Sequence, residues 1–260
     1  MLEFTDLSVR YGVGIEALNQ ANLSIPEGKV TSVIGGNGAG KSTLMRAASG
    51  ILSFHGGLVT SGNITFGGES LLGKTAPQIV EMGLVHVPEG RRIFGDLTVI
   101  ENLRAGGATV KSGKKRESEL KRVLELFPIL AERRNQRAGL LSGGQQQMLA
   151  ITRGMMSSPK TILLDEPTLG LAPQTVEQVA QVITQINEEG ITVVVVEQNA
   201  AMALGVSDFG NVLEQGKVVM SDKASVLRGS PEVQKLFLGG DTGGTKFVER
   251  KVKPLERWSA

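Results

Sequence analysis

Two short, almost wholly apolar runs dominate the hydrophobic pattern of the chain. They are Thr161-Ile-Leu-Leu and Ile191-Thr-Val-Val-Val-Val. Both are far shorter than the ~20 residues that a membrane-spanning helix needs, and continuous runs of this length are typical of strands buried on both faces of a parallel sheet. A helical pattern over 173–189, ending at Gly190, separates them. The segment therefore predicts a β-α-β unit.

The amino-terminal part of the chain has a different pattern. Over 2–34, short β-type runs are separated by turns that contain glycine and proline, which predicts a small β subdomain leading into a core strand. The strand breaks at Gly35, and a helix is predicted from Lys41 to Ser49. A further β segment is predicted around 58–66.

The remainder of the chain is mostly helical in pattern. From Leu97 to Met156 the apolar spacing predicts helices, beside a basic stretch at 111–116 that we expect to be a solvated loop. A hairpin is predicted around Glu214-Gln-Gly-Lys, and a short helix to Leu238 closes the body. The polar last 20 residues, 241–260, are predicted to form a flexible tail.

Composition excludes several classes of function. The 28 Lys and Arg against 26 Asp and Glu leave a net charge of only +2, which argues against nucleic acid as a partner. With no cysteine and two histidines, disulfide frameworks, thiolate metal sites and histidine-rich metal sites are excluded. The amino terminus lacks a signal-peptide pattern, so we expect a cytoplasmic location. Glycine is enriched, at 34 of 260 residues.

Part of this glycine lies in a candidate phosphate-binding loop. The run Gly35-Gly-Asn-Gly-Ala-Gly-Lys-Ser follows a predicted strand and opens a predicted helix, which is the context that a G-x4-G-K-S/T loop requires. Backbone N–H groups and the helix N-terminus would surround a β-phosphate. Lys41 would contact the β- and γ-phosphates and Ser42 would bind Mg²⁺. The alternative is an ordinary glycine-rich turn.

Two acids, Asp165 and Glu166, end the first apolar run. The carboxyl ends of strands are where open α/β sheets bind their ligands. Asp165 suits Mg²⁺ held through water, and Glu166 suits the group that orients or deprotonates an attacking water. A solvated strand end is the alternative, but two adjacent acids would repel each other there without a cation or a proton.

Leu141-Ser-Gly-Gly-Gln, at the start of a helical run, is a weak signal by itself because Ser142 is also a good N-cap residue. Between the phosphate loop and the acidic strand end it becomes specific. Over residues 2–240 the chain resembles the ATP-binding subunits of ABC transporters. The resemblance implies an α/β P-loop ATPase of the ABC type, with a RecA-like parallel-sheet core, an N-terminal antiparallel β subdomain and an inserted α-helical subdomain at about 97–156. The ATPase domain would be 1–240.

The resemblance also assigns roles to single residues. Tyr11 would stack on adenine, with a packed core aromatic as the alternative. Glu166, Gln198 and Lys41 would be catalytic, whereas Ser42, Asp165 and Glu89 would hold Mg²⁺. The residues implied to bind ATP are Tyr11, Gly35, Gly36, Asn37, Gly38, Ala39, Gly40, Lys41, Ser42, Thr43, Glu89, Ser142, Gly143, Gly144 and Gln145. In the implied dimer, Ser142 and Gly144 of one subunit cap the γ-phosphate held by Lys41 of the other.

Three positions depart from the family pattern. Glu89 replaces the loop glutamine that senses Mg²⁺ and contacts the membrane subunit, Gln198 replaces the switch histidine, and Ala172 stands where many relatives carry an aspartate. Gln198 can donate a hydrogen bond to the γ-phosphate but cannot carry charge. A silent regulatory ATPase is the alternative. His55 and His86 match no catalytic role and are predicted to be structural or surface residues.

The same segments point to one subfamily. Stretches such as Pro88-Glu-Gly-Arg-Arg-Ile-Phe and Val196-Glu-Gln-Asn-Ala resemble the smaller ATP-binding subunit of the high-affinity importers of leucine, isoleucine and valine. The resemblance implies a peripheral subunit on the inner face of the membrane, with a second ATP-binding subunit (or a homodimer when isolated), two permeases and, indirectly, an external binding protein as partners. Alternatives are another solute such as urea or a short amide, a soluble ABC ATPase of translation or DNA repair, and a P-loop small-molecule kinase.

Overall fold

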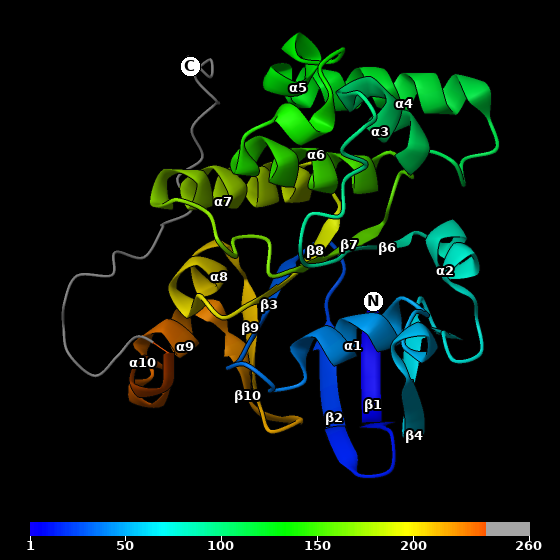
Figure 1. Cartoon of the computed structure of the whole chain (residues 1–260). Coiled ribbons are helices and arrows are strands. Elements are labelled where there is room, and N and C mark those ends of the chain that lie inside the picture. Colours follow the sequence, from blue (N-terminus) through cyan, green and yellow to red (C-terminus); the bar gives the residue numbers. More distant parts are fainter. Residues whose placement is uncertain (238–260) are drawn as a thin grey trace.

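The computed structural model describes residues 1–237, which form two β-sheets with helices around them (Figure 1). The first sheet is antiparallel and has the strand order β2-β1-β4-β5. Its strands are β1 (Leu2–Tyr11), β2 (Ile15–Ile25), β4 (Gly57–Phe66) and β5 (Glu69–Ser70). The antiparallel β structure predicted at the amino terminus is therefore present. Its strands are longer than the β-type runs from which they were predicted.

The second sheet has the strand order β10-β9-β3-β8-β7-β6. Neighbouring strands from β9 to β6 run parallel, and β10 pairs with β9 in an antiparallel hairpin. The strands are β3 (Val30–Ile34), β6 (Leu84–Val87), β7 (Thr161–Asp165), β8 (Thr192–Glu197), β9 (Phe209–Glu214) and β10 (Lys217–Lys223). The predicted parallel core is confirmed, with one antiparallel edge strand.

Helices cover both faces of this core sheet. Val193 and Val195 pack with residues of α6 and α7, whereas Val194 and Val196 pack with α1 and the antiparallel sheet. Figure 1 shows α3 to α6 gathered at one end of the molecule and the antiparallel sheet at the other. The α-helices are α1 (Lys41–Ala48), α2 (Ala76–Met82), α3 (Val99–Gly106), α4 (Gly113–Leu126), α5 (Pro128–Glu132), α6 (Gly143–Met155), α7 (Pro173–Glu188), α8 (Ala200–Val206), α9 (Ala224–Gly229) and α10 (Pro231–Phe237).

The two apolar runs form β7 and β8, in which every residue is buried. Because all side chains of these strands meet packed neighbours, their sequences show no alternation of polar and apolar positions. The predicted closing helix is interrupted at Ser230, giving α9 and α10. The predicted tail, 241–260, and the end of the proposed domain at 240 lie outside the described residues.

The segment between β4 and α3 was not predicted in any detail. It contains α2 and the four-residue strand β6, which pairs with β7. A run this short, with a histidine inside it, gives no usable periodicity. No helix within residues 1–237 has the length and apolar character needed to cross a membrane.

Candidate functional site

The predicted phosphate loop lies between β3 and the first residue of α1. Gly40 has a φ of 107°, and a Cβ atom there would lie 2.5 Å from the carbonyl oxygen of Ala17. Only glycine fits this position without strain. The buried Lys41 side chain turns back over the loop, and its Nζ donates to the carbonyl oxygens of Gly35 at 2.8 Å and Gly36 at 3.0 Å. The loop therefore holds a cation against its own backbone.

The second acid of the strand end lies beside this lysine. Lys41 Nζ is 3.3 Å from Glu166 Oε1, and Gln198 Nε2 is 3.1 Å from each oxygen of the Glu166 carboxylate. Gln198 also donates to Asn37 Oδ1 at 2.6 Å. Glu166 has a φ of 45°, and its N–H donates to Val196 O at 2.8 Å. The three predicted catalytic residues are therefore adjacent, and the Glu166 backbone is held in an unusual conformation.

Asp165, the first acid, is 4% exposed and accepts a hydrogen bond from Ser42 Oγ at 3.3 Å. The pKa of Asp165 is raised to about 6, mainly by burial. The carboxylates of Glu166 and Glu89 contribute to this rise, while the Ser42 hydrogen bond and Arg46 oppose it. Two hard oxygen donors beside an excess of negative charge suit Mg²⁺, which takes few protein ligands and completes its shell with water and phosphate. The predicted donor set therefore fits this metal.

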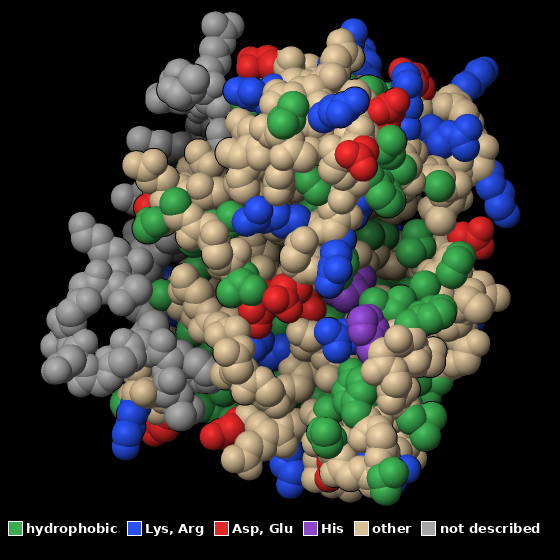
Figure 2. Space-filling view, viewed as in Figure 1, with side chains coloured by type: hydrophobic (Ala, Val, Ile, Leu, Met, Phe, Trp, Pro, Cys, Tyr) green, Lys and Arg blue, Asp and Glu red, His purple; other side chains and the backbone are tan. Residues whose placement is uncertain are grey.

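A cavity of about 570 Å³ lies next to these residues. Among the predicted site residues, its lining contains Tyr11, Asn37, Gly38, Ala39, Gly40, Lys41, Ser42, Thr43, Glu89, Glu166 and Gln198. Tyr11 is half-buried, with its hydroxyl 3.3 Å from Thr43 Oγ1 and its ring against the core. Figure 2 shows acidic side chains and both histidines gathered near the middle of the face that it presents.

The Leu141-Ser-Gly-Gly-Gln segment lies elsewhere. Ser142 is the exposed N-cap of α6: its Oγ accepts from Gln145 N–H, and the Gln145 side chain accepts from Ser142 N–H in return. This capping box orders the start of the helix. None of residues 142–145 lines the 570 Å³ cavity, so the chain by itself does not bring this segment to the phosphate loop.

Comparison with known proteins identifies this arrangement. The profile of the ABC transporter family matches residues 18–169. The chain is also 45% identical to the high-affinity branched-chain amino acid transport ATP-binding protein BraG of Pseudomonas aeruginosa, over 92% of this chain and all of BraG.

The chain belongs to the ABC transporter family.

Two further relatives have lower sequence identity to this chain. The chain is 32% identical to BraF of the same organism, over 92% of this chain and 98% of BraF, and 30% identical to the probable branched-chain amino acid transport ATP-binding protein LivF of Archaeoglobus fulgidus, over 89% and 98%. The ADP conformation of an ATP-binding cassette from an ABC transporter superposes with a TM-score of 0.79 at 26% identity, covering 92% of this chain and 98% of that one. The α/β fold predicted from sequence is thus the fold of the ABC ATPase cassettes.

The positions that depart from the ABC pattern have clear places in the structure. Gln198 contacts both Glu166 and Asn37, and the exposed Glu89 lines the same cavity as the loop. Ala172 is the N-cap of α7 and provides no side-chain cap, which an aspartate could supply. Two of the three departures, Glu89 and Gln198, therefore alter side chains at the site, and the third, Ala172, alters the start of α7. The phosphate loop itself keeps every residue of its motif.

Some residues near the site carry no recognisable sequence signal. The buried Glu197 accepts from the N–H and Oγ of Thr168, at 2.8 and 2.6 Å, and so holds the turn after Glu166. Arg91 donates to Gln146 Oε1 at 3.2 Å and lies against Gly143, which links the loop after Glu89 to α6. Only the folded arrangement shows these contacts, because the partners are far apart in sequence.

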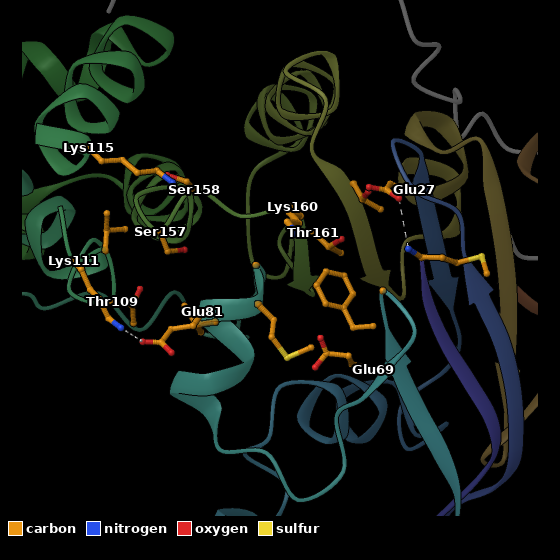
Figure 3. A pocket seen from close by; sticks show the side chains of 18 of the residues that line it. Glu27, Glu69, Glu81, Thr109, Lys111, Lys115, Ser157, Ser158, Lys160 and Thr161 are labelled. Atoms are coloured by element: carbon orange, nitrogen blue, oxygen red, sulfur yellow. Dashed lines mark ion pairs between the residues drawn. The ribbon is translucent and has the colours of Figure 1, made fainter.

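A second cavity, of about 690 Å³, lies at the amino-terminal ends of the core strands, where β7 and β8 begin (Figure 3). Its charges are mixed: Lys111 Nζ is 4.0 Å from Glu81 Oε1, and Lys115 and Lys160 also line it. It contains no phosphate-loop residue. Exposed lysines and glutamates of this kind do not make a phosphate site without a loop of backbone donors.

A substitution at Gly144 tests how the start of α6 packs. A Cβ atom at Gly144 would collide with Thr175 Cγ2 of α7. We expect Gly144→Ala to lower the free energy of unfolding by about 1–3 kcal/mol, the usual cost of overpacking. Thr175→Ser removes that methyl group and should restore most of the loss in the double variant. Urea unfolding of the four proteins measures this coupling, and additive effects of the two changes would contradict it.

The pH dependence of stability tests the environments of Asp165 and His86. Burial, Arg46 and His55 lower the pKa of His86 from 6.5 to about 4, whereas that of Asp165 is raised from 3.8 to about 6. Asp165 therefore contributes stability that is present at low pH and lost as pH rises through about 6. His86 contributes stability that is present above pH 6.5 and lost as pH falls toward 4.

The two contributions oppose each other in the wild type, and each corresponds to about 3 kcal/mol at ~1.4 kcal/mol per pKa unit. As the pH falls from 7 to 4, the free energy of unfolding of Asp165→Asn should fall relative to that of the wild type. Over the same range, the free energy of unfolding of His86→Leu should rise relative to that of the wild type. Denaturant unfolding across this range measures both slopes. Variants with the slope of the wild type would show that neither group titrates as the structure implies.

Proposed function

We propose that this protein is the ATP-hydrolysing subunit that energises import of branched-chain amino acids through a membrane ABC transporter. The observation that carries the proposal is the 45% identity to BraG along the whole of that protein, against 32% to BraF. The chain would thus correspond to the BraG-like member of a pair of ATP-binding subunits. A complete phosphate loop beside two acids supports an active ATPase and argues against a silent one.

In this function the loop holds ATP. The N–H groups of 36–43 and the start of α1 would surround the β-phosphate, while Lys41 would exchange its contacts with Gly35 O and Gly36 O for phosphate oxygens. Tyr11 borders the cavity where an adenine ring would stack. Ser42 and Asp165 would hold Mg²⁺, with Glu89 facing its water shell. When bound, Mg²⁺ would neutralise negative charge on the phosphates.

Hydrolysis would depend on Glu166. Its carboxylate lies between Lys41 and Gln198, so it is held where it could accept a proton from water directed at the γ-phosphate. Gln198 would keep that carboxylate in place with one N–H of its amide and would turn the other from Asn37 Oδ1 to phosphate, since the NH₂ group has two donors and carries no charge. The buried Glu197, which holds Thr168, would fix the turn that presents Glu166.

A second subunit would complete the site. The Ser142–Gly144 segment is at the N-terminus of α6 and outside its own cavity. The Ser142 N–H is used in the capping box, and the N–H groups of Gly143 and Gly144 would be offered to a phosphate held by another chain. Dimeric cassettes exist among solved relatives: one in a post-hydrolysis state with ADP and Pi matches with a TM-score of 0.73 at 27% identity, covering 86% of this chain and 99% of that one. In the transporter the partner would be the second ATP-binding subunit.

Two permease subunits would bind near the loop that follows Glu89. Phe94, Leu97 and Leu140 are 50%, 38% and 72% exposed there. Asn102 is buried and hydrogen-bonded to both the N–H and the carbonyl oxygen of Phe94. These bonds hold the loop backbone in place, so that it could serve as a contact surface for the permeases. Because Arg91 joins it to α6, movement of the permeases could pass to the Ser142–Gly144 segment. This attachment would place the protein on the inner face of the membrane.

Uptake of labelled leucine into vesicles that hold the assembled complex tests the proposed function. We expect uptake that requires ATP and is lost with Glu166→Gln in this subunit. Competition by urea, a short amide and other amino acids then defines the solute, which the ATP-binding subunit itself does not contact. Active ATPase without leucine uptake would refute the solute assignment. Stimulation by ribosomes or DNA, with no permease co-purifying, would refute transport.

A further inference from the structure

We infer that His86 is a positioning residue for Asp165: its Nε2–H points at the carboxylate and holds it so that Oδ1 stays with Ser42. This inference rests on the proposed nucleotide site only for its consequence, Mg²⁺ affinity. The tautomer of His86 can be measured without any nucleotide.

The position of His86 follows from strand geometry. It is the third residue of β6, two residues after Leu84, and so faces the same side of the sheet, toward α1. Its side chain is 6% exposed. His86 Nδ1 lies 3.1 Å from the Oγ of Ser49, the C-cap residue of α1, and Nε2 lies 4.0 Å from Asp165 Oδ2. Within the described residues, Nε2 has no hydrogen-bond partner.

The two tautomers of the neutral ring have different costs. With hydrogen on Nδ1, that nitrogen donates to Ser49 Oγ, and the lone pair of Nε2 is buried facing a carboxylate oxygen. With hydrogen on Nε2, the Ser49 hydroxyl donates to Nδ1 and the Nε2–H dipole faces the carboxylate. Only the second arrangement gives favourable electrostatics at both nitrogens. At 4.0 Å the contact is longer than a hydrogen bond and acts as a directed dipole.

Ser49 is able to support this tautomer. Its Oγ is 2.8 Å from Met45 O, but the same carbonyl already accepts from the Ser49 N–H at 3.0 Å. Turning the hydroxyl hydrogen toward His86 therefore leaves no buried carbonyl unsatisfied. The result is a chain from Ser49 through His86 to Asp165, which connects the end of α1 to the end of β7.

The two oxygens of Asp165 then have separate partners. Oδ1 accepts from Ser42, the neighbour of Lys41, and Oδ2 faces His86. A carboxylate held by a hydrogen bond at one oxygen and oriented by a dipole at the other loses less rotational freedom when it engages a metal ion or its water. Groups that support metal ligands in this way typically account for about 10–100-fold in metal affinity.

Three variants separate positioning from simple packing. His86→Gln keeps an N–H near the place of Nε2, His86→Leu fills the space without a donor, and His55→Gln changes the other histidine, which is exposed. We expect His86→Leu to weaken Mn²⁺ binding to the protein–ADP complex by about 10–100-fold, measured by electron paramagnetic resonance, with ADP affinity in the absence of metal unchanged. His86→Gln and His55→Gln should bind Mn²⁺ like the wild type.

Wild-type Mn²⁺ affinity in His86→Leu, or equal losses in His86→Leu and His86→Gln with unchanged unfolding midpoints, would overturn the inference. A second measurement needs no variant to fold: ¹⁵N NMR of the histidine rings in the metal-free wild type should place the proton of His86 on Nε2. A proton on Nδ1 would also overturn it. Absence of ATP hydrolysis would count against the proposed function and would leave this tautomer result intact.

Discussion

Replacing Glu166 with glutamine is expected to lower ATP hydrolysis by about 10²–10⁴-fold, the usual contribution of a group that takes a proton in the transition state. Glutamine keeps the shape of the side chain and its contact with Gln198, but an amide cannot accept that proton. ATP binding should be retained or improved, because one negative charge beside Lys41 and the phosphates is removed. The variant should therefore accumulate as an ATP-bound dimer.

Phosphate release and size-exclusion chromatography with ATP measure these two effects. Glu188→Gln, at the exposed carboxyl end of α7, removes the same charge far from the loop and should hydrolyse ATP at the wild-type rate. Brisk turnover by Glu166→Gln would show that another group activates the water. The proton-accepting role given to Glu166 would then be wrong.

Lys41→Ala is expected to weaken ATP binding and to abolish hydrolysis. Each hydrogen bond from a charged donor typically contributes about 1.5–3 kcal/mol, and Lys41 can give more than one to phosphate. Its loss also leaves Glu166, whose side chain is 9% exposed, without a neighbouring cation and facing the phosphates. We therefore expect at least a tenfold loss of ATP affinity, at ~1.4 kcal/mol for each factor of ten, and no measurable hydrolysis.

The control for this change is Lys160→Ala. Lys160 is an exposed lysine that lines the 690 Å³ cavity in Figure 3, at the amino-terminal ends of the core strands. Isothermal titration with ATP should show wild-type affinity for this variant. If Lys160→Ala lost affinity and Lys41→Ala kept it, the nucleotide would bind in the wrong cavity for the proposed mechanism.

The sequence predicted the parts of the site whose physical causes are local. A phosphate loop needs glycines that allow φ values such as 77° at Gly38 and 107° at Gly40, and that requirement is visible as a spacing. Strands β7 and β8 were predicted almost to the residue, because burial on both faces demands a continuous apolar run. The small amino-terminal β subdomain was predicted from short β-type runs separated by turns, and the helices from 97 to 156 from apolar spacing. That the amino-terminal sheet is antiparallel was implied by the family resemblance.

The parts that could not be predicted depend on partners distant in sequence. His86 was predicted to be structural or on the surface, and nothing in its neighbours shows that Asp165 lies 4.0 Å away. The contact between Arg91 and Gln146 joins a loop to helix α6, across 55 positions of sequence. Strand β6 is defined by its pairing with β7. Its four residues are too few to show a strand pattern in the sequence. Tertiary contacts of this kind override local preference.

The central claim is that two chains build each hydrolytic site. Lys41→Ala destroys the phosphate loop, whereas Ser142→Asp keeps an N-cap residue on α6 but places a negative charge toward the γ-phosphate. Each variant alone should be inactive. A mixed dimer of the two has one intact site, formed by the phosphate loop of the Ser142→Asp chain and the Ser142–Gly144 segment of the Lys41→Ala chain.

ATPase activity of the mixed variants tests this claim most directly. With random pairing, half of the dimers are mixed and each has one working site of two, so about a quarter of the wild-type rate should return. Activity that appears only on mixing is the predicted result. Activity of Ser142→Asp alone, or none in a mixture shown by cross-linking to contain mixed dimers, would contradict the account.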